Sequence, residues 1–138
     1  MRFRSPIRAR AGWLAAACVA ALAPLLAASP AAAGTPAPTG SYLLKVTPQD
    51  GTAARTATLT CGPDGGTHAD PAAACAQLRR TGGRVEGIPE SQGACTLEYA
   101  PVRVSATGTW QGRQYRYERT YPNRCAAVRA TGGVLFAF

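Results

Sequence analysis

The chain is poor in the side chains on which most catalytic sites are built. Its 138 residues include one histidine, His68, which lies in a glycine-rich turn, where a histidine is typically a hydrogen-bonding residue. None of its serines occurs in a Gly-x-Ser-x-Gly motif, and no closely spaced pair of carboxylates suits glycosidase-type acid–base chemistry. The sequence therefore predicts a protein that is not an enzyme and that uses no cofactor.

Cysteines with the spacing of a metal site are also absent. Beyond residue 33 the cysteines are Cys61, Cys75, Cys95 and Cys125, with no Cys-x-x-Cys pair among them, so we expect no bound metal. An even number of cysteines favours two disulfides if the chain is exported, as its N-terminal residues predict. Paired cysteines also argue against a reduced Cys–His nucleophile. Spacing alone leaves three connectivities open.

The N-terminal residues have the three parts of a secretory signal peptide. A basic start (MRFRSPIRAR) precedes a run rich in Ala and Leu, and small residues end the segment at Ala33. A membrane anchor is the alternative, but Pro24 interrupts the apolar run and no second hydrophobic span follows. We therefore expect residues 1–33 to be cleaved and the mature protein to be secreted, extracellular and free of the membrane.

Much of the positive charge belongs to that N-terminal segment. Four of the 15 basic side chains precede residue 34, which leaves 11 against seven acids and lowers the net charge from +8 to +4. Apart from Arg79–Arg80 and the series Arg113, Arg116 and Arg119, the remaining arginines are scattered. Scattered arginines are typical of a solvated surface, so we expect no binding to nucleic acid.

Residues 34–138 are enough for one domain with a modest core. The Pro-, Thr- and Gly-rich residues 34–40 predict a flexible leader, and residues 41–138 the folded domain. Alternating or continuous apolar residues predict five strands, over residues 41–47, 55–61, 102–109, 113–121 and 134–138. Gln111–Gly112 is the expected hairpin turn, and residues 62–69 have the composition of a turn.

Two short helices are predicted from their capping residues. Asp70 followed by Pro71 begins a helix over 71–81, which Gly82–Gly83 ends. Asn123 can cap a second helix, which ends before Gly132–Gly133. The predicted fold is α+β: a five-stranded antiparallel sheet with both helices packed on one face and two disulfides.

One segment, CTLEYAP at residues 95–101, has an unusual composition for a connection. Leu97, a large apolar residue, lies two positions after Cys95, and Pro101 stiffens the far end. Composition leaves two interpretations equally open. Leu97 either packs into the core at the start of a strand or is displayed by an exposed loop.

Several motifs in the chain match one known family in order. They are Cys61-Gly62-Pro63, Gly66-Thr67-His68, Ala74-Cys75-Ala76, Gly108-Thr109-Trp110-Gln111-Gly112 and Phe136-Ala137-Phe138. Over nearly all of residues 34–138 the sequence resembles the Streptomyces subtilisin inhibitor family, which consists of secreted serine protease inhibitors. It departs from the family at Ala69, where proline is usual.

The resemblance implies specific roles for the cysteines and for the unusual segment. It implies the bridges Cys61–Cys75 and Cys95–Cys125, and Leu97–Glu98 as the reactive bond offered to the protease. The other protease-contacting residues that it implies are Cys95, Thr96, Tyr99, Ala100 and Pro101. It also implies a homodimer through the sheet face and a core position for Trp110.

Leu97 makes subtilisin-like proteases the first expected partners and chymotrypsin-like ones the second, because their primary pockets accept apolar side chains. Two other classes remain as alternatives. One is a non-inhibitory secreted binding module that regulates, or is processed by, another extracellular enzyme. The other is a secreted enzyme of unrecognised type.

Overall fold

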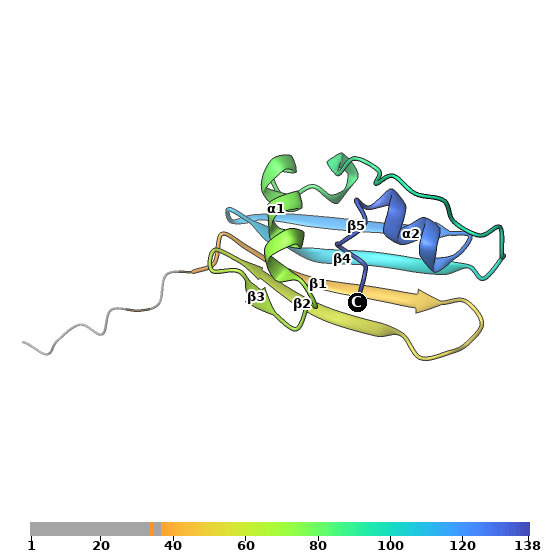
Figure 1. Cartoon of the computed structure of the whole chain (residues 1–138). Coiled ribbons are helices and arrows are strands. Elements are labelled where there is room, and N and C mark those ends of the chain that lie inside the picture. Colours follow the sequence, from red (N-terminus) through yellow and green to blue (C-terminus); the bar gives the residue numbers. More distant parts are fainter. Residues whose placement is uncertain (1–33, 35–36) are drawn as a thin grey trace, which may run out of the picture. The chain divides into compact units, whose positions relative to one another are not determined.

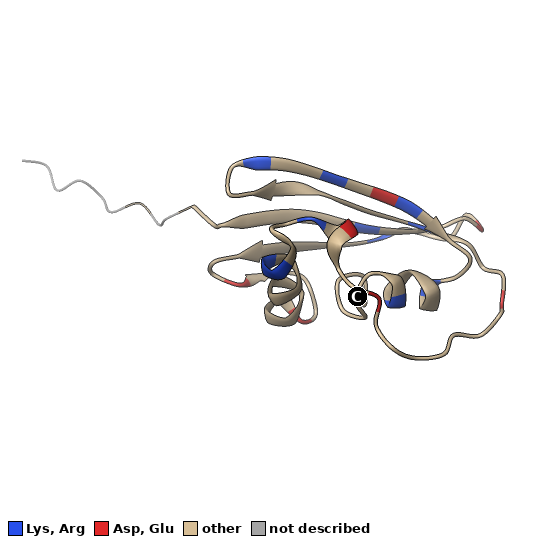
Figure 2. Ribbon diagram, turned by 90° about the horizontal axis from the view of Figure 1, so that it is seen from above, with Lys and Arg blue, Asp and Glu red and all other residues tan. Residues whose placement is uncertain are grey.

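The structure, a computed structural model, describes Gly34 and residues 37–138. The predicted signal peptide and part of the predicted leader lie outside the described residues. The folded part is a five-stranded antiparallel sheet in the order β3-β2-β1-β4-β5, with two α-helices on the same face of it (Figures 1 and 2). No helix within residues 37–138 is long and apolar enough to cross a membrane. The predicted fold class is confirmed.

The central strand, β1 (Gly40–Pro48), pairs with β2 (Arg55–Cys61) on one side and with β4 (Val102–Trp110) on the other. Its side chains alternate as a strand covered on one face requires: Tyr42, Leu44 and Val46 are buried, and the residues between them are exposed. Gly40, predicted to end the leader, is already part of this strand. A Cβ there would lie 2.4 Å from the Trp110 ring, so only glycine allows the strand to begin beside that indole.

The hairpin between β4 and β5 (Arg113–Tyr121) has the predicted turn. Gln111 and Gly112 both adopt positive φ, 49° and 76°, as a two-residue turn of this hand requires. Trp110 is buried at the start of that turn, as expected.

Both predicted helices are confirmed with their caps. Asp70 accepts a hydrogen bond from the amide of Ala73 at the start of α1 (Pro71–Thr81), and Asn123 accepts one from the amide of Ala126 at the start of α2 (Arg124–Ala130). Gly82 ends α1 at φ 62°. A single 3₁₀ turn, η1 (Val85–Gly87), follows α1.

The predicted C-terminal strand over residues 134–138 is wrong. These residues form turns and irregular backbone, in which the amide of Ala137 donates to the carbonyl of Val134. Leu135 and Phe136 are fully buried, and the Phe136 ring lies 6.4 Å from that of Tyr117. A short continuous apolar run indicates burial but cannot by itself distinguish a strand from a buried turn, and here it marks a segment that fills the core.

The fifth strand is instead β3 (Gly65–Gly66), inside the segment predicted to be a turn. Gly66 pairs with Leu59 at φ 105°, and a Cβ on it would lie 2.3 Å from the carbonyl oxygen of Thr58. The chain therefore passes so close to β2 that it adds two paired residues at the edge of the sheet. Sequence alternation cannot predict so short a strand.

The core lies between the sheet and the two helices. Its largest fully buried side chains are Phe136, Leu44, Leu59, Leu78, Leu135 and Val104. Both implied disulfides are confirmed, with Cα–Cα distances of 5.5 Å for Cys61–Cys75 and 5.7 Å for Cys95–Cys125. The first is buried and joins β2 to α1, whereas the second joins α2 to the long connection that precedes β4.

Candidate functional site

Among residues 37–138, the connection over residues 88–101 has the least regular structure. It leaves η1, passes along α2 and enters β4 without a helix or strand of its own (Figures 1 and 2). Leu97 is 101% exposed and Tyr99 is 80% exposed. Of the two interpretations of Leu97, the core position is therefore excluded. Leu97 is instead displayed on the surface by an exposed connection.

The connection is tied to the domain two residues before Leu97. The Cys95–Cys125 disulfide joins it to the second residue of α2, and the Cys125 side is exposed to solvent. A covalent link so close to Leu97 limits how far the loop can move away from the helix.

Asn123 holds the backbone on both sides of Leu97. Its side-chain amide Nδ2 donates to the carbonyl oxygens of Thr96, at 3.1 Å, and of Glu98, at 2.9 Å. Its Oδ1 accepts the hydrogen bond from Ala126 that caps α2, at 2.8 Å, so every polar atom of this buried side chain is used. The cap therefore fixes the amide in the orientation that supports the loop.

Backbone hydrogen bonds hold the other side of the loop. The amide of Ala100 donates to the carbonyl of Pro122, and the amide of Gln49 donates to the carbonyl of Pro101, both at 2.9 Å. Pro101 restricts the backbone where the loop enters β4. The residues after Leu97 are thus attached both to the segment that leads into α2 and to the end of β1.

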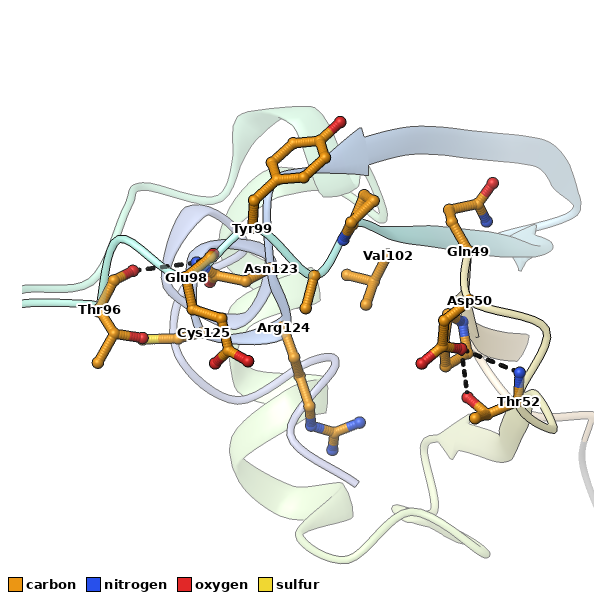
Figure 3. A pocket seen from close by; sticks show the side chains of 13 residues that line it. Gln49, Asp50, Thr52, Thr96, Glu98, Tyr99, Val102, Asn123, Arg124 and Cys125 are labelled. Atoms are coloured by element: carbon orange, nitrogen blue, oxygen red, sulfur yellow. Dashed lines mark hydrogen bonds between the residues drawn. The ribbon is translucent and has the colours of Figure 1, made fainter.

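A groove of about 590 Å³ lies between this loop and the β1–β2 connection (Figure 3). Asp50 lines one wall, and the backbone amide of Thr52, followed by its hydroxyl, lowers the pKa of this carboxyl below its usual value. Arg124 lines the floor, where burial and, to a lesser extent, the charge of Arg55 lower the pKa of the guanidinium. With Glu98 also among its lining residues, the groove carries charges of both signs, and its lining includes the residues on either side of Leu97 but not Leu97 itself.

The other residues with potential metal-binding or catalytic groups lie away from this loop and are engaged in structural contacts. Within the described residues Cys61, Asp64 and Cys75 bring potential metal-ligand atoms within 4.8 Å of one another, but the two sulfurs form a disulfide and offer no thiolate. His68 is buried. Its Nδ1 accepts from the amide of Asp70, at 3.0 Å, and its Nε2 lies 3.1 Å from the carbonyl oxygen of Leu135. Both ring nitrogens therefore have structural partners.

Sequence reasoning missed part of the loop's support. It identified Asn123 only as a helix cap and did not identify Pro122 or Gln49 as supports. The usable signal was the Cys95–Cys125 pairing, because it brings the residues just before Cys125 next to those just after Cys95. A cap that uses only the oxygen of an asparagine leaves two amide donors, and a nearby loop is the natural acceptor.

Comparison with known proteins adds an independent finding. The sequence model of the family described as "Subtilisin inhibitor-like" matches residues 37–123. Subtilisin inhibitor-like protein 2 of Streptomyces rochei is 52% identical over 82 residues, which cover 58% of this chain and 73% of that protein. Subtilisin inhibitor-like protein 5 of Streptomyces fradiae is 44% identical over 94 residues, which cover 67% and 87%.

A solved structure is similar as well. It is sermetstatin of Streptomyces caespitosus in complex with subtilisin of Bacillus licheniformis, which is 29% identical and matches with a TM-score of 0.57. The match covers 72% of this chain and 98% of that one. The chain belongs to the subtilisin inhibitor-like family.

Proposed function

We propose that the protein inhibits subtilisin-like serine proteases by presenting the Leu97–Glu98 bond as a substrate would. The observation that carries this proposal is the full exposure of Leu97 at the centre of a loop that is anchored on both sides. The similar structure is that of an inhibitor in complex with subtilisin, which supports a protease of that class as the partner. The protein acts by binding and not as an enzyme.

The anchored loop explains why the protein inhibits instead of being consumed. A flexible peptide loses conformational freedom in each residue that a protease orders, whereas this loop is held before it binds. The protease serine attacks the carbonyl carbon of Leu97, and the amine of Glu98 is the leaving group. Because Asn123 and Cys125 hold both sides of the cut, that amine stays beside the acyl group and re-forms the bond.

Neighbouring residues complete the proposed contact surface. Cys95 and Thr96 precede the reactive bond, and Tyr99, Ala100 and Pro101 follow it. Complexes of proteases with such inhibitors typically bury about 1,600 Å² in total and are among the tightest known, which fits preorganisation as the source of their affinity.

Leu97 determines the proposed selectivity. Burying a leucine in a wide apolar pocket contributes roughly 1.5–3 kcal/mol, and both subtilisin-like and chymotrypsin-like enzymes have such a pocket. A trypsin-like pocket contains a carboxylate, and leaving it unpaired costs on the order of several kcal/mol. We expect strong inhibition of subtilisin, weaker inhibition of chymotrypsin and little inhibition of trypsin.

Inhibition constants of the mature protein and of two variants against these three enzymes test the proposal. Leu97→Lys should shift the preference towards trypsin, and Leu97→Gly should weaken inhibition of all three. The control is Arg80→Ala, which shortens an exposed side chain of α1, away from the loop and from the sheet face, and should change none of the constants. If the Leu97 variants leave all three constants unaltered, the reactive bond lies elsewhere.

The mature protein is proposed to be secreted, with residues 1–33 removed. The predicted leader then ends before Gly40, the first residue of β1, and the inhibitory domain continues from there to residue 138. N-terminal sequencing of protein from the medium should begin at Gly34. Protein that stays in the cells and still begins at Met1 would contradict this proposal.

The mature protein is also proposed to be a homodimer through the sheet face opposite the helices. Leu43 is 52% exposed in the central strand of that face, between Thr58 and Thr107 on the neighbouring strands. Leu43→Arg should shift the mass in analytical ultracentrifugation from dimer to monomer, while Ala72→Arg on α1 should not. A wild-type monomer, or a dimer unaffected by Leu43→Arg, would refute it.

A further inference from the structure

A second side chain of α2, besides Cys125 and the capping residue Asn123, contacts the loop segment. Arg129 donates from Nη1 to the carbonyl oxygen of Gly93, at 2.9 Å, and its Nη2 lies 2.7 Å from Oε1 of Glu90. Its backbone carbonyl accepts a hydrogen bond from the amide of Ser91, also at 2.9 Å. One residue of the helix therefore contacts three positions of the segment that leads to the reactive bond.

The contacts of α2 follow the segment in order. Asn123 binds residues 96 and 98, Cys125 binds Cys95, and Arg129 binds residues 90, 91 and 93. The helix and the segment run side by side in opposite directions (Figures 1 and 2), so the helix supports the segment over its whole length before the reactive bond.

The disulfide alone fixes only one point of this segment. A chain held at one point can still pivot there, and Gly93, at φ 134°, is a position where pivoting is easy. A second attachment on the far side of Gly93 fixes the direction of the chain. The planar guanidinium suits this task because its parallel N–H groups reach two acceptors at once.

The placement of Arg129 differs from that of a typical surface ion pair. The side chains of Arg129 and Glu90 are 39% and 54% exposed, so this pair alone contributes little. However, Nε of Arg129 is buried without a hydrogen-bond partner among the described residues, which shows that the stem is covered. The guanidinium is therefore held against the segment, where it binds both the carbonyl oxygen of Gly93 and the carboxylate of Glu90.

We propose that Arg129 is a positioning residue of the inhibitory loop, a clasp that orients residues 90–95 independently of the Cys95–Cys125 bridge. The proposal rests on the proposed function of that loop. After attack by the protease, the Arg129 side chain gives the piece that ends at Leu97 an attachment in addition to the Cys95–Cys125 bridge and the hydrogen bond from Asn123 to Thr96. The acyl group of that piece therefore stays aligned with the amine of Glu98, even when the disulfide is absent.

The test compares Arg129→Met, which keeps the stem and the backbone carbonyl, with Arg129→Lys and with the control Arg80→Met on α1. Each is made in the wild-type chain and in a chain carrying Cys95→Ser and Cys125→Ser. We expect Arg129→Met to raise the inhibition constant for subtilisin about three- to tenfold, the effect of losing one charge-assisted hydrogen bond and a surface ion pair. The accompanying rise in the cleavage rate of Leu97–Glu98 should be larger without the bridge. Arg129→Lys should restore part of the loss, and Arg80→Met should match its parent.

Amide hydrogen exchange of residues 92–96 in the free protein provides a readout that does not depend on inhibition. Arg129→Met should accelerate exchange there and leave β1 and β4 unaffected. Exchange, inhibition and cleavage all identical to wild type would overturn the clasp. If wild type does not inhibit subtilisin, the proposed function fails, and the exchange experiment still decides whether Arg129 orders the segment.

Discussion

Asn123 combines two tasks that are usually given to different residues. Its oxygen caps α2, and its nitrogen holds the carbonyl groups on either side of Leu97. Helix formation and loop geometry therefore depend on the same side-chain orientation. This coupling places the proposed reactive bond relative to the rigid part of the domain without any additional element of structure.

Replacing Asn123 with Ser or with Ala separates the two tasks. Serine keeps an oxygen that can cap the helix but has no amide to bind Thr96 and Glu98, whereas alanine removes both functions. Both variants should weaken inhibition of subtilisin to a similar degree. Only the alanine variant should also lose the cap, at a cost of about 1 kcal/mol in the free energy of unfolding.

Inhibition constants and denaturant unfolding of the two variants provide the measurement. If alanine weakens inhibition and serine leaves it unchanged, inhibition follows stability. That outcome would mean that the Asn123 amide does not support the loop.

At the scale of elements, the helix α2 is the support of the loop. It is only seven residues long, yet it carries the cap, the bridge and the proposed clasp. The other bridge, Cys61–Cys75, is buried and joins β2 to α1 instead of joining α2 to the loop. The two disulfides therefore serve different purposes, and removing them should have different consequences.

Replacing Cys95 and Cys125 with Ser should turn a lasting inhibitor into a slowly cleaved one, because the loop loses its covalent anchor. Replacing Cys61 and Cys75 with Ala is the matched control. The losses in the free energy of unfolding should be similar, about 3–4 and about 3 kcal/mol on the chain-entropy estimate.

In the variant with Cys61→Ala and Cys75→Ala, the molecules that remain folded should still inhibit. The comparison requires inhibition assays over time together with unfolding curves. A folded Cys95→Ser, Cys125→Ser variant that remains uncleaved and tightly bound would show that the bridge does not restrain the loop.

For the whole molecule, most of the fold could be predicted because its strands are covered on one face only. Tyr42, Leu44 and Val46 alternate with exposed residues. A period of two is typical of a strand with one buried face and distinguishes it from a helix. The run that ends the chain has no such alternation, because Leu135 and Phe136 are both fully buried. Its interpretation as a strand was therefore wrong.

The candidate site could be predicted only in part, for a different reason. Leu97 stood out because a large apolar residue is unexpected in a connection, and the family resemblance indicated its role. The supports of the loop come from residues about 25 to 50 positions away in sequence, and such contacts leave no local pattern. Once the bridge from Cys95 to Cys125 is known, the neighbours of Cys125 become the natural candidates.

Mapping the cleaved bond tests most directly whether Leu97–Glu98 is what the protein presents to the protease. The mature protein is incubated with a catalytic amount of subtilisin, and the products are sequenced from their N-termini before and after reduction. One new N-terminus at Glu98 is predicted, with the two pieces joined by Cys95–Cys125 until the disulfide is reduced. A new N-terminus at any other residue, or pieces that separate without reduction, would contradict the proposed reactive bond and its anchoring.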